Sequence, residues 1–216
     1  MEDSAGMDRL RAAGMRGLPV VSRGDRFVFG VDLAQVAQLV GLTYDATPVL
    51  SPAELIARYH RVLDVAVRFA VQIPDAHLDD KLPHRDRSYL TLVNHLVQIA
   101  ADFLLVAAGK DLIGRLAESV PDANASVQAL GARSVGLKAE LTHWLEQVGE
   151  ADLARSVTTY FGEQTLHQVL ERAVWHSAQH ARQLMMVLGL LDITPLTPLT
   201  AEDLADLPMP EHVWDG

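Results

Sequence analysis

The sequence has 216 residues, of which 49% are hydrophobic and only 6% aromatic, and its formal net charge at neutral pH is −10. This length is enough for one large domain, or for a domain with a small appendage, and an apolar content made mostly of Ala, Leu and Val favours helices over a β-sandwich. The acidic balance, without a Lys/Arg-rich run, argues against a nucleic-acid partner, and the absence of cysteine excludes disulfides and thiolate ligands to a metal.

The first 42 residues are predicted to form a small ββα unit. Its elements are, in chain order, a helix, two strands joined by a tight turn, and a second helix, over residues 8–14, 18–22, 27–29 and 33–40. Asp32 is suited to cap the second helix, which ends at Gly41. A unit of this size is too small to be stable alone, so we expect it to pack on the rest of the chain or to join two copies in a homodimer.

Residues 43–216 are predicted to form a mainly α structure, a four-helix bundle with a C-terminal extension. The four long helices are expected over residues 51–73, 88–108, 125–148 and 164–191. The first begins at Ser51-Pro52-Ala53-Glu54, which combines a capping serine, a proline in the first turn and a glutamate three residues after the serine. A shorter helix over 110–119 and an irregular connection over 150–163 complete the prediction. Helices of this number and length are typical of a four-helix bundle.

Two histidines of the last long helix form a candidate metal site. His176 and His180 are four residues apart, so both imidazoles project from one face of the helix. Two histidines in this arrangement can bind one metal ion, as in the helical zinc motif His-Glu-x-x-His. Gln183 follows His176 by seven residues on the same face and is suited to bind a ligand or a metal-bound water. Spacing alone is equally compatible with a pair of partly exposed polar side chains.

A third histidine, His95, lies in an otherwise apolar predicted helix. An imidazole among apolar side chains needs a polar partner, which either a metal ion or a hydrogen bond in the core can supply. Asp102 follows His95 by seven residues, so it shares that face of the helix and can orient a ligand. Asp102 and Glu163 are also the carboxylates considered as general bases. By contrast, Glu171 and Arg172 are expected to be a solvated helix pair.

The order of these residues resembles the metal-binding pattern of DinB-like proteins. His95 stands in a helix that begins at Ser88, and His-x3-His-x2-Gln follows in the last long helix. The segment 207–214, LPMPEHVW, is similar to the tail of the mycothiol-dependent maleylpyruvate isomerase branch, and the resemblance covers about residues 50–216. The usual His-x2-His-His-Arg-Gly-Gln is altered, because Gln179 replaces the middle His and Arg182 stands where Gly is usual. Substrate contacts are therefore expected to differ near Arg182.

The resemblance implies a DinB-like four-helix bundle that holds a divalent metal, usually zinc or nickel, on His95, His176 and His180. Open coordination positions would make the metal a Lewis acid that binds water or a thiol. Many relatives are similar to transferases or isomerases that use a low-molecular-weight thiol, and this implies a small-molecule substrate. A hydrolase with metal-bound hydroxide and a non-catalytic metal-binding stress protein are the alternatives.

The N-terminal unit resembles the second half of a glutaredoxin, with the first half and its cysteine motif missing. In that family a cis-proline strand and a Gly-x-Asp helix start contact glutathione, which implies thiol binding by Leu18, Pro19, Gly30 and Asp32, and a cis Leu18–Pro19 bond. A hairpin that only packs or dimerises is the alternative.

The sequence also predicts the compartment. Its N-terminal stretch MEDSAGMDRLRAAG lacks the apolar core of a signal peptide, and no run of about 18 apolar residues occurs. We therefore expect a cytoplasmic protein that does not span a membrane.

Overall fold

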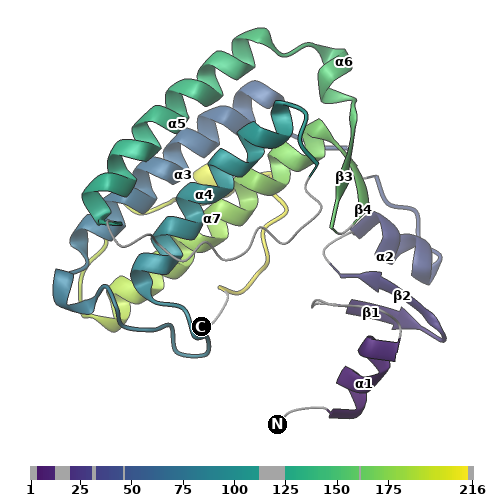
Figure 1. The fold of residues 1–216 in the computed structure, drawn as a ribbon, viewed down its shortest axis with the longest axis horizontal. Helices are drawn as coiled ribbons and strands as arrows, with labels where there is room; N and C mark the ends of the chain where they lie inside the picture. Colours follow the sequence, from purple (N-terminus) through teal and green to yellow (C-terminus); the bar gives the residue numbers. More distant parts are fainter. Residues whose placement is uncertain are drawn as a thin grey trace. The chain divides into compact units, whose positions relative to one another are not determined.

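The computed structural model describes residues 4–12, 20–30, 33–45, 47–111, 125–160 and 162–213. The chain forms two compact units. One comprises Met1–Thr47 together with Tyr160–Glu163, and the other comprises Pro48–Thr159 and Gln164–Gly216. Figure 1 shows the elements of both, and each unit is described by itself below.

The N-terminal unit contains the predicted ββα arrangement. Its elements, in chain order, are α1 (Ser4–Ala12), β1 (Val20–Arg23), β2 (Arg26–Phe29) and α2 (Leu33–Val40). The two strands are antiparallel, with Val20 opposite Phe29 at one end and Arg23 opposite Arg26 at the other. The first helix begins four residues earlier than the sequence analysis placed it. Leu18, Pro19 and Asp32 lie outside the described residues, so the cis bond stays a prediction.

The second unit is a four-helix bundle, as predicted (Figure 1). Its long helices are α3 (Pro52–Gln72), α4 (Tyr89–Ala107), α5 (Val127–Gln147) and α7 (Leu166–Leu190). The capping box at the start of α3 is present, because the Glu54 carboxylate accepts the Ser51 N–H at 2.8 Å and the Ser51 hydroxyl accepts the Glu54 N–H at 3.3 Å. Such caps satisfy the N–H groups that have no partner within a helix, and they fix where each helix begins.

The hydrophobic core lies between the four long helices of the bundle. Both α5 and α7 pack against α3 and α4. Large apolar side chains fill the centre, among them Tyr59, Phe69, Leu96, Phe103 and Leu170. Burial of such side chains is the main favourable contribution to folding, at roughly 1.5–3 kcal/mol each.

Helix α4 is the most apolar helix of the bundle. It has 19 residues, and an 18-residue window within it has a mean hydropathy of 1.7, so by length and composition alone it would be able to cross a membrane. Half of the apolar window is buried inside the protein, as for the core helix of a bundle. It also carries Asn94, His95, Gln98 and Asp102, and polar groups of this kind are costly in a lipid environment.

Residues 150–163 were expected to be irregular, and this was wrong. They contain the short helix α6 (Glu150–Leu153) and the strand β3 (Ser156–Thr159), which pairs with β4 (Gly162–Thr165). Along β3 the side chains alternate between exposed and buried, with Val157 and Thr159 buried. This alternation of β-branched residues is the pattern of a half-buried strand. The helix predicted over 110–119 falls largely on residues 112–124, which lie outside the described residues.

The segment that follows α7 runs back along α3. Successive α3 side chains bind it: Gln72 Nε2 donates to the Thr194 carbonyl at 2.9 Å and Arg68 donates to the Thr197 carbonyl at 3.3 Å. Nearer the start of α3, Arg61 forms an ion pair with Asp203 at 3.1 Å. Asp203 also caps the short helix α8 (Ala201–Leu204). The segment is therefore antiparallel to α3 and held at several points.

Candidate metal centre

Three histidines from two helices meet in the bundle. The ring centroids of His176 and His180 on α7 lie 4.7 Å apart, and the His95 ring on α4 lies 5.6 Å from His176 and 4.9 Å from His180. One nitrogen from each ring lies within 4.8 Å of the other two. The predicted meeting of the three rings is confirmed, well inside the separation of about 8 Å that a single ion cannot span.

Local sequence and helix packing each supply part of this geometry. The spacing of four residues places His176 and His180 on one face of α7, and the packing of α4 against α7 brings His95 to that face. His180 is only 1% exposed, whereas His95 and His176 are partly exposed. The cluster is therefore buried at His180 and partly exposed at His95 and His176.

The electrostatic environment keeps the two α7 histidines neutral. Burial lowers the pKa of His176 well below its ordinary value, and His180, Arg172, His95 and Arg87 lower it further. Burial is also the largest cause of the lowered pKa of His180. A neutral imidazole carries a lone pair on one nitrogen, and this is the form that binds a metal.

Gln183 orients His180. The Nδ1–H of His180 donates to Oε1 of Gln183 at 2.5 Å, and the Gln183 side chain is fully buried. This bond assigns the proton of His180 to Nδ1 and leaves Nε2 unprotonated, facing Nε2 of His176 at 3.1 Å. Metal-binding histidines usually donate their second ring nitrogen in this way. The sequence analysis placed Gln183 on the right face but did not predict this partner.

The donor set fits a divalent ion. Two nitrogens bound to one ion at about 2.0–2.1 Å, with tetrahedral angles, lie roughly 3.3 Å apart, and the Nε2 atoms of His176 and His180 are 3.1 Å apart. Three imidazoles suit zinc, nickel and other borderline ions, and they leave at least one coordination position for another ligand. His95, His176 and His180 are the residues that would hold the metal.

Glu171 and Arg172, expected to be a solvated helix pair, each have a neighbour within the bundle. Both side chains are partly buried. The Arg172 guanidinium lies over the Trp175 ring, with its central carbon 5.2 Å from the ring centroid. The Glu171 carboxylate accepts a hydrogen bond from the Val49 backbone, and burial raises its pKa. An i,i+3 pairing of Arg172 with Trp175 was readable from the sequence, because such residues are neighbours on a helix surface.

Arg182 and Gln179 bind the C-terminal segment. One Arg182 nitrogen donates to Oε1 of Gln179 at 2.9 Å and to the Pro210 carbonyl at 2.8 Å, and the other donates to the Glu211 carbonyl at 3.0 Å. Gln179 Nε2 donates to the His212 carbonyl at 3.0 Å. Gln179 and Arg182, two of the residues that depart from the usual motif, therefore hold residues 210–212 against α7.

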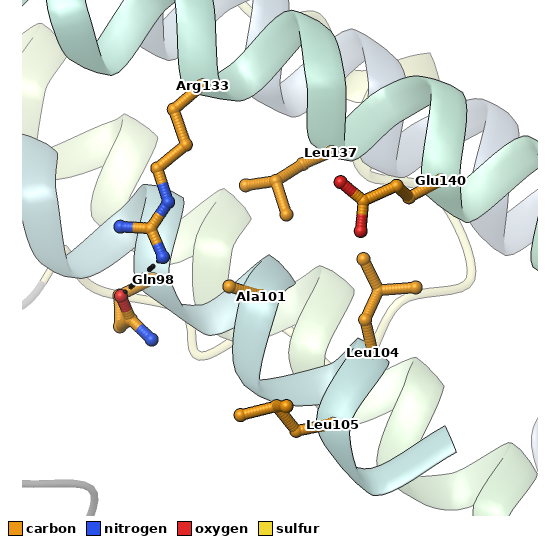
Figure 2. Close-up of a pocket in the computed structure, with 7 residues that line it drawn as sticks. All are labelled: Gln98, Ala101, Leu104, Leu105, Arg133, Leu137 and Glu140. Atoms are coloured by element: carbon orange, nitrogen blue, oxygen red, sulfur yellow. Dashed lines mark hydrogen bonds between the residues drawn. The ribbon is translucent and has the colours of Figure 1, made fainter. Parts of the chain in front are cut away.

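Asp102 belongs to a separate polar chain between α4 and α5. Gln98 Nε2 donates to Asp102 Oδ1 at 2.6 Å, and Arg133 donates to Oε1 of Gln98 at 2.8 Å. Burial raises the pKa of Asp102. Figure 2 shows Gln98 and Arg133 at the edge of a groove of about 450 Å³ that is lined by α4 and α5 and includes none of the three histidines. The other candidate base, Glu163, is exposed on β4.

The fold and the cluster define a class: a DinB-like four-helix bundle with three histidines in metal-binding geometry. Residues 87–184, just under half of the chain, match the model of the DinB superfamily, and this stretch includes all three histidines. Among solved structures, YfiT from Bacillus subtilis is similar, with 18% identity and a TM-score of 0.58 over 71% of this chain and 96% of that one. YfiT is described as a probable metal-dependent hydrolase with an unusual four-helix bundle topology. No curated protein matches the chain.

Proposed function

We propose that this protein is a metal-dependent enzyme that activates a low-molecular-weight thiol, or acts on a thiol conjugate, as an S-transferase or isomerase. The observation that carries the proposal is the cluster of His95, His176 and His180, with one nitrogen from each ring within 4.8 Å of the others. Zinc or nickel are the ions that this donor set favours. A bound ion of this kind lowers the pKa of a coordinated thiol or water.

The charge balance supports an anionic ligand on the metal. Three neutral imidazoles leave the two positive charges of the ion uncompensated, and Arg87 and Arg172 add positive charge close to the cluster. Thiolate and hydroxide are the anions that such a site stabilises best. The chain contributes the three ligands and the orientation of His180 by Gln183, and two of the ligands, His95 and His176, are partly exposed.

Hydrolysis is the second candidate. It is favoured by the description of YfiT, whose fold this chain shares, as a probable metal-dependent hydrolase. The same cluster would then hold hydroxide in place of a thiolate. Asp102 and Glu163 stay candidate bases in either reaction, and Arg182 a candidate substrate contact.

The N-terminal unit is proposed to bind the thiol, glutathione or a similar compound, through Leu18, Pro19, Gly30 and Asp32. The alternative role, joining two copies in a homodimer, uses the same hairpin. We also propose that the protein is cytoplasmic, where thiols of this kind are abundant and the conditions are reducing.

Metal content and thiol dependence test the proposal. Purified protein is analysed for metals, loaded with zinc or nickel, and assayed for conjugation of glutathione to an aryl halide and, without thiol, for hydrolysis of an activated ester. Thiol-dependent turnover that is lost in His95→Ala and kept in His143→Ala supports the transferase, because His143 is exposed on α5. Ester hydrolysis alone supports the hydrolase. Metal binding without either activity identifies a non-catalytic metal-binding protein and overturns the proposal.

A further inference from the structure

The groove between α4 and α5 is a second candidate binding site. Its volume of about 450 Å³ lies in the range of small-molecule sites, and none of the three histidines lines it. The two helices run in the same direction along the groove, because Gln98 bonds to Arg133 near one end. Further along both helices, the Phe103 and Trp144 rings pack with their centroids 4.9 Å apart. The groove therefore follows both helices, and its two ends are formed by different residues.

Arg133 supplies the cationic end of the groove. It donates to Oε1 of Gln98 at 2.8 Å, and Nε2 of Gln98 donates to Asp102 at 2.6 Å. Both polar groups of the Gln98 amide are thus engaged, and this fixes the side chain that holds the guanidinium. A guanidinium has five N–H donors, and the bond to Gln98 uses one of them. The side chain is exposed, so its other donors remain available to a ligand.

Glu140 supplies the anionic end. It follows Arg133 by seven residues, two turns of the helix, so both lie on one face of α5 with their backbone positions about 10 Å apart. The Glu140 side chain is exposed, and among the described residues its carboxylate takes part in no hydrogen bond or ion pair. A carboxylate in this position favours a ligand that brings a cationic N–H donor.

The lining between the two ends is apolar. Figure 2 shows Arg133 and Gln98 at one end and Glu140 at the other, and the remaining lining residues are Ala101, Leu104, Leu105 and Leu137. Leu105 is 52% exposed, so a saturated chain lying in the groove would remove apolar surface from water on both sides of the contact. Charge and hydropathy thus change along the groove from cationic through apolar to anionic.

We propose that the groove between α4 and α5 binds an elongated small molecule with a carboxylate at one end, a saturated middle and an amino group at the other end. Arg133 binds the carboxylate, the leucines contact the middle, and Glu140 binds the amino group. A ligand with one charged end satisfies only one of the two side chains, so the opposite charges select a zwitterion. The site lies outside the metal centre and does not depend on the proposed function.

A set of linear compounds that differ in end groups and length tests the inference. The central probe is 8-aminooctanoate, whose charged ends are about 10 Å apart when it is extended. Octanoate and octylamine each lack one charge, and 4-aminobutyrate has both charges on a shorter chain. Each is titrated into ¹⁵N-labelled, zinc-loaded full-length protein and followed through the backbone amide signals of Gln98, Ala101, Leu105 and Leu137.

We expect 8-aminooctanoate to shift the groove signals and to leave those of His176 and His180 unchanged. It should bind about threefold more tightly than octanoate or octylamine, which is the size of effect that one exposed ion pair gives. The short zwitterion should bind least tightly, because it cannot reach both charged side chains and covers little of the apolar lining.

The variants assign each end of the ligand to one residue. Arg133→Gln should bind 8-aminooctanoate no more tightly than octylamine, and Glu140→Gln should bind it no more tightly than octanoate. Arg133→Lys keeps the positive charge and should keep part of the preference. Glu146→Gln is the matched control, because it removes an exposed carboxylate from α5 that does not line the groove, and it should change nothing. The amide spectrum of each variant also reports whether its fold is intact.

Four results would overturn the inference. They are equal binding of the three eight-carbon compounds, a preference for the zwitterion that persists in both glutamine variants, shifts at the histidines instead of the groove, and no binding of any compound. The proposed function is tested separately by metal content and turnover, so each of these results would leave it intact.

Discussion

The bond between His180 and Gln183 gives the sharpest test of the metal centre. Gln183→Leu keeps a side chain of similar volume at a fully buried position but removes the acceptor that lies 2.5 Å from Nδ1 of His180. The imidazole N–H is then buried without that partner, at a cost of about 1–3 kcal/mol in the free energy of unfolding. The ring also loses the bond that selects its tautomer. Loss of such a partner typically weakens metal binding by about 10–100-fold.

The assay is competition between the protein and a chromophoric zinc chelator, together with urea unfolding of the metal-free protein. Gln179→Leu is the matched control. Gln179 is equally buried on α7, but it donates to the backbone carbonyl of His212 and does not bond to an imidazole of the candidate metal site. It should lower stability by a similar amount and leave zinc affinity within about twofold of the wild type. Gln183→Glu keeps an acceptor and should keep the affinity. Zinc affinity in Gln183→Leu equal to that of Gln179→Leu would refute the reasoning.

Three further predictions concern other parts of the bundle. His176→Ala should lose stoichiometric metal at modest chelator concentrations while its helical circular dichroism persists, and His143→Ala, altered at an exposed histidine, should keep the metal. Burial raises the pKa of Asp102 above its ordinary 3.8, so the folded state binds that proton more tightly and stability falls as pH rises through the folded pKa. Asp102→Asn lacks this loss, and its stability relative to the wild type should therefore increase between about pH 4 and about pH 7 in urea unfolding; an unchanged difference would contradict the assignment. Arg182→Ala removes three hydrogen bonds, so it should cost about 1–2 kcal/mol and speed cleavage after Glu211 by a Glu-specific protease, and an unaltered cleavage rate would show that these bonds do not hold the segment.

The long helices were predictable because their boundaries are set locally. Ser51, Ser88 and Thr165 each accept a backbone N–H from the residue three positions later, and a cap of this kind depends on a few neighbouring residues. The strand at 156–159 had a readable pattern as well, with Val157 and Thr159 alternating with polar residues. It was missed because four residues are too few for periodicity to distinguish a strand from a connection.

The candidate site divides in the same way. The pairing of His176 with His180 follows from helix geometry, whereas the approach of His95 depends on how α4 packs against α7, for which the sequence offered only a resemblance. Arg87 shows most clearly what local sequence cannot predict. It lies in a polar stretch that predicts exposure, and yet it is 4% exposed, because its burial results from tertiary packing that no local pattern encodes.

The segment over 194–212 has a consequence for biosynthesis. It binds α3 through Gln72, Arg68 and Arg61 and α7 through Arg182 and Gln179. Because it follows all four long helices in the chain, the ribosome makes it after them, and until then the side chains of α3 and α7 that bind it lack these partners. Nascent chains emerge N-terminus first and fold as they lengthen. The bundle therefore forms its full set of hydrogen bonds only after this segment leaves the exit tunnel. A premature stop codon near residue 193 would yield four complete long helices without the segment that binds both α3 and α7.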